Sequence, residues 1–316
     1  MIAPACQHAR RKKHGKDRKG QQRWRCPDCR KTFTSDQRRP LGDMRIDLDK
    51  ACTVLGLLLE GMSIRACSRV CKIKPDTICD LVLLVGQNCQ RFLREKVKGV
   101  AAKRIELDEI WGFIYAKSRT VERNNLSLAY GDSWTWLAID ADSKLILSHA
   151  VGHRNEHTCR RFLEQLRDST TGPCQVTSDG LRLYTLGVPL YLGTRCSFAQ
   201  LIKTYSASQV ETRYSPATIT GIEKTIRFGS PDEDKISTSY SERLNLSVRM
   251  HVRRFTRLTN AHSKSVDHHA AMMAIFCAWY NHCRCNQSLG KKVSPAMAAG
   301  LTEKPWTIRE LLEAAA

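Results

Sequence analysis

The spacing of apolar residues changes near residue 98 and divides the chain into two kinds of structure. From residue 46 to about residue 96 apolar residues recur three and four positions apart, which predicts three or four short helices. Gly61 and residues 72–75 interrupt this pattern. Beyond residue 98, the segments RIELDEIWGFIYAK, SWTWLAIDAD and KLILSHAVG are rich in β-branched and aromatic residues, which is typical of strands. The order predicts an α/β domain preceded by a small helical region.

The second half of the chain continues the α/β pattern. NEHTCRRFLEQLRDS predicts a helix, and CQVTSD predicts a strand that runs into a turn at Gly180. Residues 185–236 mix Gly, Pro and Ser with short apolar runs, so we assign them to an irregular insertion with some strand. Helices are predicted over 239–258 and 264–283, and the end, WTIRELLEAAA, reads as an amphipathic tail.

A chain of 316 residues is long enough for two or more domains. We predict a basic segment like a zinc knuckle (1–40), a helix-turn-helix domain (41–97), the α/β domain (98–285) and a carboxyl-terminal tail (286–316).

The charge balance points to an acidic polymer as partner. Lys and Arg exceed Asp and Glu by 51 to 31, giving a formal charge of +20. The longest apolar run, AAMMAIFCAWY, is about half of the roughly 20 residues that span a bilayer, so no membrane role is expected. The first residues lack the apolar stretch of a signal peptide, and 14 cysteines in so long a chain fit reduced thiols in a cytoplasm.

Residues 10–31 contain eleven Lys or Arg and two acids, with almost no aliphatic side chains, so they cannot bury a core alone. CPDC places Cys26 and Cys29 at the spacing of a zinc knuckle. Cys6 and His8 would complete the zinc site, with His14 as the substitute for His8. The alternatives are surface thiols in a basic tail and a redox pair, but a redox pair prefers a helix start after a strand.

The helical region has the layout of a helix-turn-helix. A helix from Ser63, a tight turn at 72–75 and a further helix would place early side chains of the last helix in a DNA major groove. Lys72, Lys74, Thr77 and Arg65 are the side chains placed to contact DNA. Three-helix segments without a DNA function are common, but this one lies beside a basic segment in a strongly basic chain.

Three carboxylates stand in settings unlike the others. Asp108 lies within a predicted strand, Asp179 at the end of another, and Glu242 near the start of a long helix. A carboxylate in a core strand is costly unless it is paired or bound to a cation. Convergent carboxylates suit Mg²⁺ or Mn²⁺, and two such ions can assist phosphoryl transfer.

Ordinary structural roles compete with the catalytic one. Asp179 precedes Gly180 and suits a turn, and Glu242 suits the first turn of a helix. Alternation along the strand puts Glu106 and Asp108 on one face and Glu109 on the other, so spacing cannot choose between Asp108 and Glu109.

The helix that begins near Glu242 predicts an ordered stripe. Steps of three and four place Asn245, Arg249 and Arg253 behind Glu242, and Arg243 is adjacent. A single acid with such neighbours can hold an ion together with the phosphates attached to it. A solvated basic helix would explain the arginines but not their order.

The motifs DEIWGF, VTSDGLRLY, ETRYSP, TSYSERLNLSVRMHVRRFTRLTNAHSK and SPAMAAGL closely resemble the transposases of the bacterial insertion-sequence-one family. The resemblance runs from GQQRWRCPDCRKTF onward. It implies an RNase H-like catalytic domain with a DDE triad, preceded by a zinc finger and a helix-turn-helix. Carried over by motif, the triad is Asp108, Asp179 and Glu242. The chain departs from many relatives in having Cys6-Gln7-His8 in place of a complete CxxC.

The expected function is therefore that of a DNA transposase. The amino-terminal region would bind the terminal inverted repeats of its element, and the RNase H-like domain would cleave and join strands with two Mg²⁺ or Mn²⁺ ions. By resemblance, several copies would assemble on paired DNA ends in the bacterial cytoplasm, at the nucleoid. The rivals are a DNA-binding regulator with a non-catalytic remnant domain and a nuclease that cleaves without joining.

Overall fold

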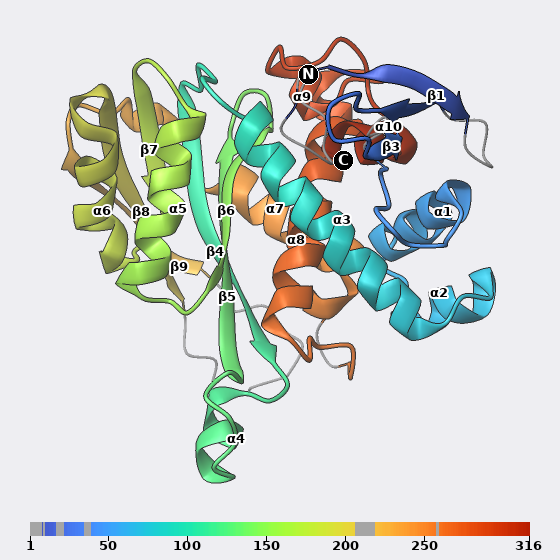
Figure 1. Cartoon of the computed structure of the whole chain (residues 1–316). Coiled ribbons are helices and arrows are strands. Elements are labelled where there is room, and N and C mark those ends of the chain that lie inside the picture. Colours follow the sequence, from blue (N-terminus) through green and yellow to red (C-terminus); the bar gives the residue numbers. More distant parts are fainter. Residues whose placement is uncertain (1–7, 9, 17–21, 35–38, 206–218, 257–258) are drawn as a thin grey trace.

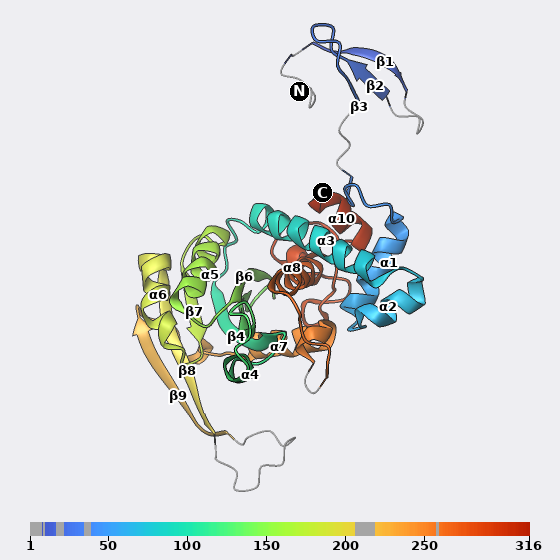
Figure 2. The ribbon, with the colours of Figure 1, turned by 60° about the horizontal axis from the view of Figure 1, so that its bottom comes forward.

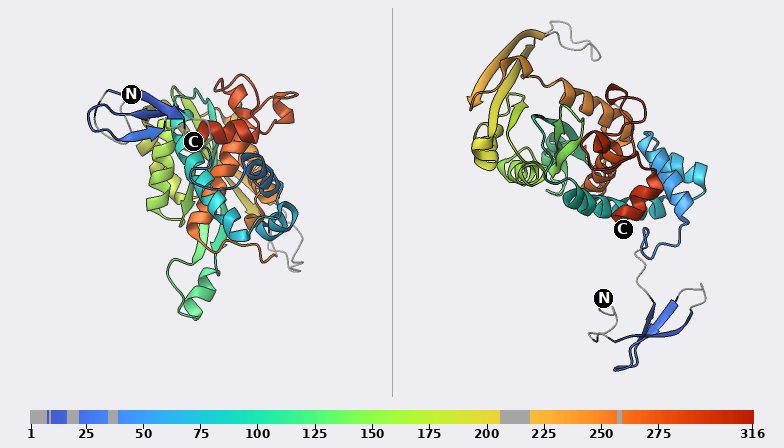
Figure 3. Two further views of the ribbon diagram at one scale, coloured as in Figure 1. Left: turned by 45° about the vertical axis from the view of Figure 1, so that its right-hand side comes forward. Right: turned by 90° about the horizontal axis from the view of Figure 1, so that it is seen from above.

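The computed structural model of the protein describes residues 8, 10–16, 22–34, 39–205, 219–256 and 259–316. In the described part of the amino-terminal segment, three short antiparallel strands form a sheet in the order β1-β2-β3. These strands are β1 Lys12–Lys16, β2 Gln22–Arg25 and β3 Thr32–Thr34. Figures 2 and 3 show this small sheet apart from a larger α/β body that contains the rest of the described chain.

Within the described ranges the larger body contains one mixed sheet of six strands in the order β6-β5-β4-β7-β8-β9. The strands are β4 Arg104–Ile114, β5 Gly131–Asp140, β6 Ile146–Gly152, β7 Cys174–Ser178, β8 Cys196–Tyr205 and β9 Ile219–Phe228. β7 runs parallel to both β4 and β8, whereas the other neighbours are antiparallel. This mixed α/β architecture fits the RNase H-like fold that the resemblance implies.

The helices cover both faces of this sheet (Figure 1). They are α1 Leu48–Leu59, α2 Ile64–Cys71, α3 Pro75–Lys96, α4 Ser118–Arg123, α5 Glu156–Ser169, α6 Arg182–Leu192, α7 Ser239–His251, α8 Val266–His282, α9 Pro295–Ala298 and α10 Ile308–Ala315. Four 3₁₀ turns also lie in the described ranges: Gly193–Arg195, Glu233–Lys235, Arg253–Phe255 and Gln287–Leu289. α5 and α6 pack on one face, and α7 and α8 pack on the other, with α3 lying across α8. None of the described helices is long and apolar enough to span a bilayer.

The long helix α3 joins the predicted helix-turn-helix region to the rest of the core. It crosses α8 so closely that a Cβ on Gly86 would lie 2.4 Å from the Cβ of Ala271. Only a glycine permits that approach. Buried side chains of α1, α2 and α3 belong to the same hydrophobic cluster as those of the sheet and α8. Residues 41–97 therefore share a core with the α/β body, and α10 adds Leu311 and Leu312 to it from the predicted tail.

Residues 185–236 are more regular than the predicted irregular insertion, and the strand expected among them is present. The segment contains most of α6 and the strands β8 and β9, the last two pairs of the six-stranded sheet. CSFAQLIKTY forms a strand because β7 and β9 flank it and most of its first six residues are buried. Residues 206–218 lie outside the described ranges.

The helix predicted over 239–258 ends earlier, at His251. Val252 has φ −110° and ψ 97°, an extended backbone that a helix cannot continue, and its side chain is buried. The 3₁₀ turn Arg253–Phe255 then brings Phe255 into the core. Most of the other predicted elements are present, including three helices between residues 46 and 96.

Three buried histidines make the stability of this fold depend on pH. Burial lowers the pKa of His149 to about 4, with Arg94 contributing, that of His269 to about 3, with Arg254 contributing, and that of His282 to about 4. An unfolded histidine titrates near pH 6.5, so between about pH 6.5 and 4 the unfolded chain binds protons that the folded chain does not.

We therefore expect each of these histidines to lower the free energy of unfolding as the pH drops from about 6.5 to about 4, by up to about 1.4 kcal/mol per pH unit. The buried carboxyl groups of Asp108 and Glu109, whose pKa is raised to about 7 and about 8, contribute with the opposite sign. His149→Leu removes one histidine contribution, so below about pH 6.5 the variant should lose less stability per pH unit than the wild-type protein. Urea denaturation at a series of pH values measures the slope. An unchanged slope in the variant would contradict this assignment.

Candidate active site

Asp108 lies in the middle of β4 and faces α7. Its Oδ1 accepts a hydrogen bond from its neighbour's backbone, Glu109 N, at 2.8 Å, and its Oδ2 accepts one from Asn245 Nδ2 at 2.6 Å. Burial raises the pKa of Asp108 to about 7, and the charges of Asp179 and Glu242 add to the rise. With this pKa, the carboxyl group of Asp108 is partly protonated at neutral pH. A cation bound beside it would stabilise the charged carboxylate.

Asp179 directly follows β7, the strand that runs parallel to β4. The last residue pair between these strands is Leu107 and Ser178, so Asp179 and Asp108 each come next in their own strand. Oδ1 accepts a hydrogen bond from Leu181 N at 3.1 Å, which is the turn role that its position before Gly180 suggested. Oδ2 lies 3.6 Å from Nη2 of Arg154. The turn role and a place in the site are thus compatible, because they use different oxygens.

Glu242 lies in the first turn of α7. Its Oε1 accepts a hydrogen bond from Thr238 Oγ1 at 2.8 Å and forms an ion pair with Lys203 of β8. Its side chain is 49% exposed, and that of Asp179 is 43% exposed. Solvent and ligands can therefore reach both of these acids.

Glu106 has a role in positioning the candidate site that the sequence did not predict. Its Oε2 accepts hydrogen bonds from the backbone N–H groups of Tyr240 and Ser241, at 2.8 and 2.9 Å. These are free donors at the start of α7, where the helix dipole also favours a negative charge. Glu106 therefore fixes the start of α7 on β4, two residues from Asp108. The shared face of Glu106 and Asp108 was the signal in the sequence that could have found it.

Glu109 points to the opposite face of the sheet and has different partners. Its side chain is 1% exposed, and its Oε2 accepts hydrogen bonds from Nε and Nη2 of Arg154 at 3.2 and 3.0 Å. Its Oε1 accepts one from the hydroxyl of Tyr184 on α6. Burial raises the pKa of Glu109 to about 8, and Asp179 adds to the rise. Arg154, which the sequence did not single out, therefore bridges Glu109 and Asp179.

The three predicted catalytic acids are neighbours but are not packed as a closed metal site. In the described part of the chain, the group of potential ligands with atoms all within 4.8 Å is His8, Cys26 and Cys29. In this arrangement, donors from the chain itself contact the acids: Asn245 on Asp108, Arg154 on Asp179 and Lys203 on Glu242.

Asn245 has a feature that bears on metal binding. Its Oδ1 is buried and has no hydrogen-bond partner among the described residues. A buried acceptor of this kind is costly unless a donor reaches it. Next to the Asp108 carboxylate, a water bound to a divalent ion would supply that donor, so the residues present fit such an ion.

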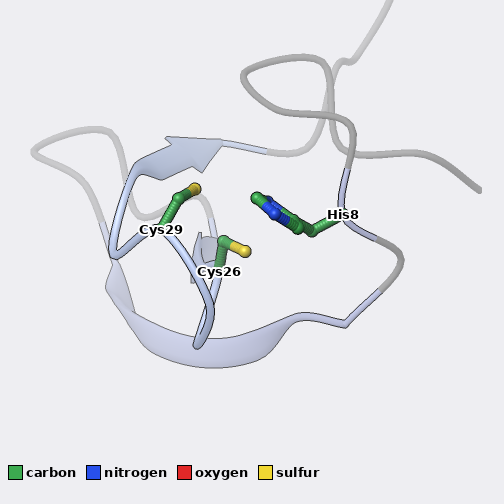
Figure 4. Close-up of side chains that lie close together, drawn as sticks. All are labelled: His8, Cys26 and Cys29. Carbon is green, nitrogen blue, oxygen red and sulfur yellow. The ribbon is translucent and has the colours of Figure 1, made fainter.

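The amino-terminal cluster fits a metal of a different kind (Figure 4). Cys26 is fully buried, Cys29 is part-buried and His8 is exposed. Their two thiol groups and the imidazole ring lie together, with the possible ligand atoms within 4.8 Å of one another. The Cys26 N–H donates to the Lys31 carbonyl oxygen at 2.9 Å, which closes the turn that holds both thiols. Cys6, the predicted fourth ligand, lies outside the described residues. His14 is exposed on β1 and is not in the cluster.

The predicted DNA-contacting residues fall into two groups. Arg65 of α2 and Arg253 after α7 line one cleft of about 780 Å³, although they are far apart in the sequence. Lys72, Lys74 and Arg243 are exposed elsewhere, and Thr77 is part-buried in the first turn of α3. Arg249 is part-buried and donates from Nη1 to the Phe255 carbonyl oxygen at 3.4 Å, so it supports the turn after α7.

Comparison with known proteins supports the resemblance seen in the motifs. No protein-family model matches the chain. The insertion element iso-IS1n protein InsB of Shigella dysenteriae is 26% identical over 171 residues, which are 54% of this chain and 91% of that protein. The resemblance to the insertion-sequence-one transposases is confirmed.

A solved transposase structure also aligns with the chain. A cryo-EM structure of the piggyBac transposase synaptic complex with hairpin DNA aligns with 86% of this chain and 73% of its own, at 9% identity and a TM-score of 0.33. At that TM-score the alignment does not bear on the resemblance to the insertion-sequence-one transposases.

We expect Arg154→Ala, measured above the Glu109 pKa of about 8, to lower the free energy of unfolding by about 1–3 kcal/mol, because it leaves the buried Glu109 carboxylate without its cation. Urea denaturation measures the loss. Adding Glu109→Gln in the same chain should recover part of it, because a neutral amide needs no cation and still accepts from Tyr184. Equal losses in the single and double variants would show that the ion pair has no such role.

Proposed function

We propose that the chain is a DNA transposase whose Asp108, Asp179 and Glu242 hold divalent metal ions and catalyse strand cleavage and strand transfer. The observation that supports this most directly is the hydrogen bond from Asn245 Nδ2 to Asp108 Oδ2 at 2.6 Å. It joins the Glu-Arg-x-Asn helix to the Asp-Glu-Ile-Trp strand, and both motifs are among those that carry the resemblance. Those two motifs therefore meet in space as a catalytic site would require.

The carboxylates have the chemistry that Mg²⁺ or Mn²⁺ needs. Hard cations of this type take oxygen ligands and leave positions for water and phosphate. Two of them can stabilise both the attacking and the leaving oxygen of an in-line phosphoryl transfer. Burial is the main cause of the raised pKa of Asp108, and repulsion from Asp179 and Glu242 adds to it. Bound cations would offset both costs.

The chain's own residues would position the reacting DNA. Arg154 and Lys203 lie against Asp179 and Glu242, at the place where a phosphate would approach the acids. When the acids bind cations, these two side chains are free to contact phosphate oxygens. Asn245 would keep Asp108 oriented, and exposed Arg243 next to Glu242 would add a further positive charge.

The amino-terminal region would recognise the element. Under this proposal the small sheet binds Zn²⁺ through His8, Cys26, Cys29 and Cys6, and α1–α3 form the helix-turn-helix that reads the terminal inverted repeats. Lys72, Lys74, Thr77 and Arg65 would contact DNA, and several copies would assemble on the paired ends in the cytoplasm. Binding should weaken steeply with salt, because phosphates release counterions.

For the acids, we expect Asp108→Asn, Asp179→Asn and Glu242→Gln each to reduce strand transfer at least about a hundredfold, because each removes part of the transition-state charge stabilisation. The assay incubates purified protein and terminal-repeat DNA with and without Mg²⁺ and sizes the nicked and joined products. DNA binding should persist in all three variants.

The same assay separates the rivals. A regulator would bind the ends without metal-dependent nicking, and a nuclease would give nicked but no joined products. Full joining by a folded Asp179→Asn protein would remove Asp179 from the mechanism.

For the amino-terminal cluster, we expect purified protein to contain one Zn²⁺ per chain, because two thiolates and an imidazole at this spacing favour zinc. Cys26→Ser should lose the ion, and a chelator should increase hydrogen exchange in β1–β3, whose few apolar side chains cannot hold the sheet alone. Metal analysis and hydrogen exchange measure both effects. Cys285→Ser, which changes an exposed thiol outside the cluster, is the matched control.

A further inference from the structure

A row of ring side chains lies on the face of β4 and β5 that also bears Glu109. Trp111 of β4 is directly opposite Trp134 of β5, and the rings of Trp111 and Phe113 are 5.6 Å apart. His262 stacks on Phe113 at 4.7 Å with an interplanar angle of 30°. We call Trp134, Trp111, Phe113 and His262 the aromatic strip.

The strip lies where the sheet is left open. β7 pairs with β4 only from Arg104 to Leu107, and β6 pairs with β5 only as far as Trp134. Beyond the Trp111–Trp134 pair, β4 and β5 extend toward α4 as a two-stranded arm (Figure 1). Trp136, two residues further into the sheet than Trp134, is fully buried and contacts Phe162 of α5. The four rings of the strip are only part-buried. Trp134 still packs against the hydrophobic core, whereas Trp111 and Phe113 do not belong to that cluster.

One end of the strip reaches the candidate active site. The guanidinium carbon of Arg154 lies 4.7 Å from the ring centroid of Trp134, and Nη2 of the same residue lies 3.6 Å from Asp179. Asp108 and Glu242 lie on the α7 face, so a strand of nucleotides leaving the acids would pass Asp179 at the edge of β4 that β7 leaves unpaired beyond Leu107. It would then meet Arg154 first and Trp134 next.

Positive charges accompany the rings. Lys117 lies 5.6 Å from the ring of Trp111, and Lys264 lies 5.9 Å from the ring of Tyr115, two residues after Phe113. Besides the buried Glu109, Asp132 lies on this face, opposite Phe113, and its Oδ1 accepts a hydrogen bond from Ser118 N at 3.2 Å. That carboxylate is therefore tied to the start of α4, and the charges beside the rings are mainly cationic.

The other end of the strip opens into the cleft of about 780 Å³ described above. His262 and Lys264 line this cleft together with Arg65, Arg253 and Arg254, and none of its described lining residues is acidic. Its floor is partly apolar, with Leu58, Met62, Ile64 and Met272. Rings that can stack, next to a groove of this charge, are the combination by which proteins bind nucleic acid whose bases are unpaired.

We propose that the aromatic strip binds unpaired nucleotides of the DNA end by stacking, and guides that strand from the carboxylates toward the basic cleft. The proposal rests on the proposed function, because it takes DNA as the substrate of the acids. It adds a binding site for a single strand, separate from the helices predicted to read duplex DNA. Base stacking tolerates any sequence, so the strip would contribute affinity without specificity.

The test compares two DNAs that differ only in their end. Full-length protein is titrated, without Mg²⁺, against a blunt terminal-repeat duplex and against the same duplex with a short single-stranded tail, and anisotropy gives each Kd. We expect wild-type protein to prefer the tailed DNA. Trp111→Ala should weaken tailed binding about tenfold and leave blunt binding unchanged, because one stacked base is lost.

Two further variants control the test. Trp111→Phe keeps a ring and should retain most of the preference. Leu190→Ala removes an exposed apolar side chain from α6, 74% exposed and outside the strip, and should change neither Kd. Equal binding of the tailed DNA by Trp111→Ala and wild-type protein would overturn the proposal. An equal loss on both DNAs would also overturn it, because the ring would then contact the duplex.

A measurement on wild-type protein covers the case in which Trp111→Ala does not fold. A fluorescent adenine analogue in the tail should be quenched on binding, because stacking on a ring quenches it, and an unquenched signal would overturn the proposal. Failure of the proposed function is seen separately. Asp179→Asn should keep the tail preference, so loss of joining with the preference intact bears on the acids alone, and joining without any tail preference bears on the strip alone.

Discussion

The attachment of α7 to β4 is the contact on which the candidate site depends. Glu242 is on α7 and Asp108 is on β4, and only the fold relates them. Glu106 accepts the first free N–H groups of the helix, and Asn245 donates to Asp108 one turn beyond Glu242. Two contacts a turn apart fix both the position and the rotation of the helix. Because an α-helix turns by about 100° per residue, the same two contacts determine which face presents Glu242.

The close crossing of α3 and α8 fixes the position of the helices α1–α3 on the α/β body. Gly86 lets the two helices approach to a distance that any side chain would prevent, and the buried cluster continues from α1–α3 into the sheet. The predicted DNA-reading helices are thus not tethered to the α/β body by a linker alone. Arg65 and Arg253 line one cleft as a result. Duplex bound at α2 and α3 would lie in a fixed relation to the carboxylates, which suits cleavage at a defined distance from a recognised end.

The spacing of apolar residues and the sequence motifs predicted many of the helices and strands. The features that they did not predict depend on contacts between residues far apart in the sequence. The three helices between residues 46 and 96 and strands β4–β7 were predictable because each is a continuous run with one period. β8 and β9 were not, because their Gly-, Pro- and Ser-containing surroundings hide strands that only neighbouring strands stabilise. Arg154 gave no local signal at all. It stands alone between a strand and a helix, and its role comes from two acids 45 and 25 residues away in sequence, Glu109 and Asp179. Alternation had left Asp108 and Glu109 equivalent, and the structure gives them different partners on opposite faces.

The three acids differ in what holds them, and that difference bears on how ions could enter the site. Asp108 is part-buried and held by neutral donors, an amide and a backbone N–H, which cannot neutralise it. Asp179 and Glu242 are nearly half exposed and form ion pairs with Arg154 and Lys203, and exposed ion pairs of this kind contribute little to stability. Arg154 keeps its two hydrogen bonds to buried Glu109 even when it leaves Asp179, so the charge is not lost from the site. Cations that enter the site would therefore replace the ion pairs of Asp179 and Glu242 and would neutralise the Asp108 carboxylate. The balance favours ion binding because the acid that gains most is the one with no cation of its own.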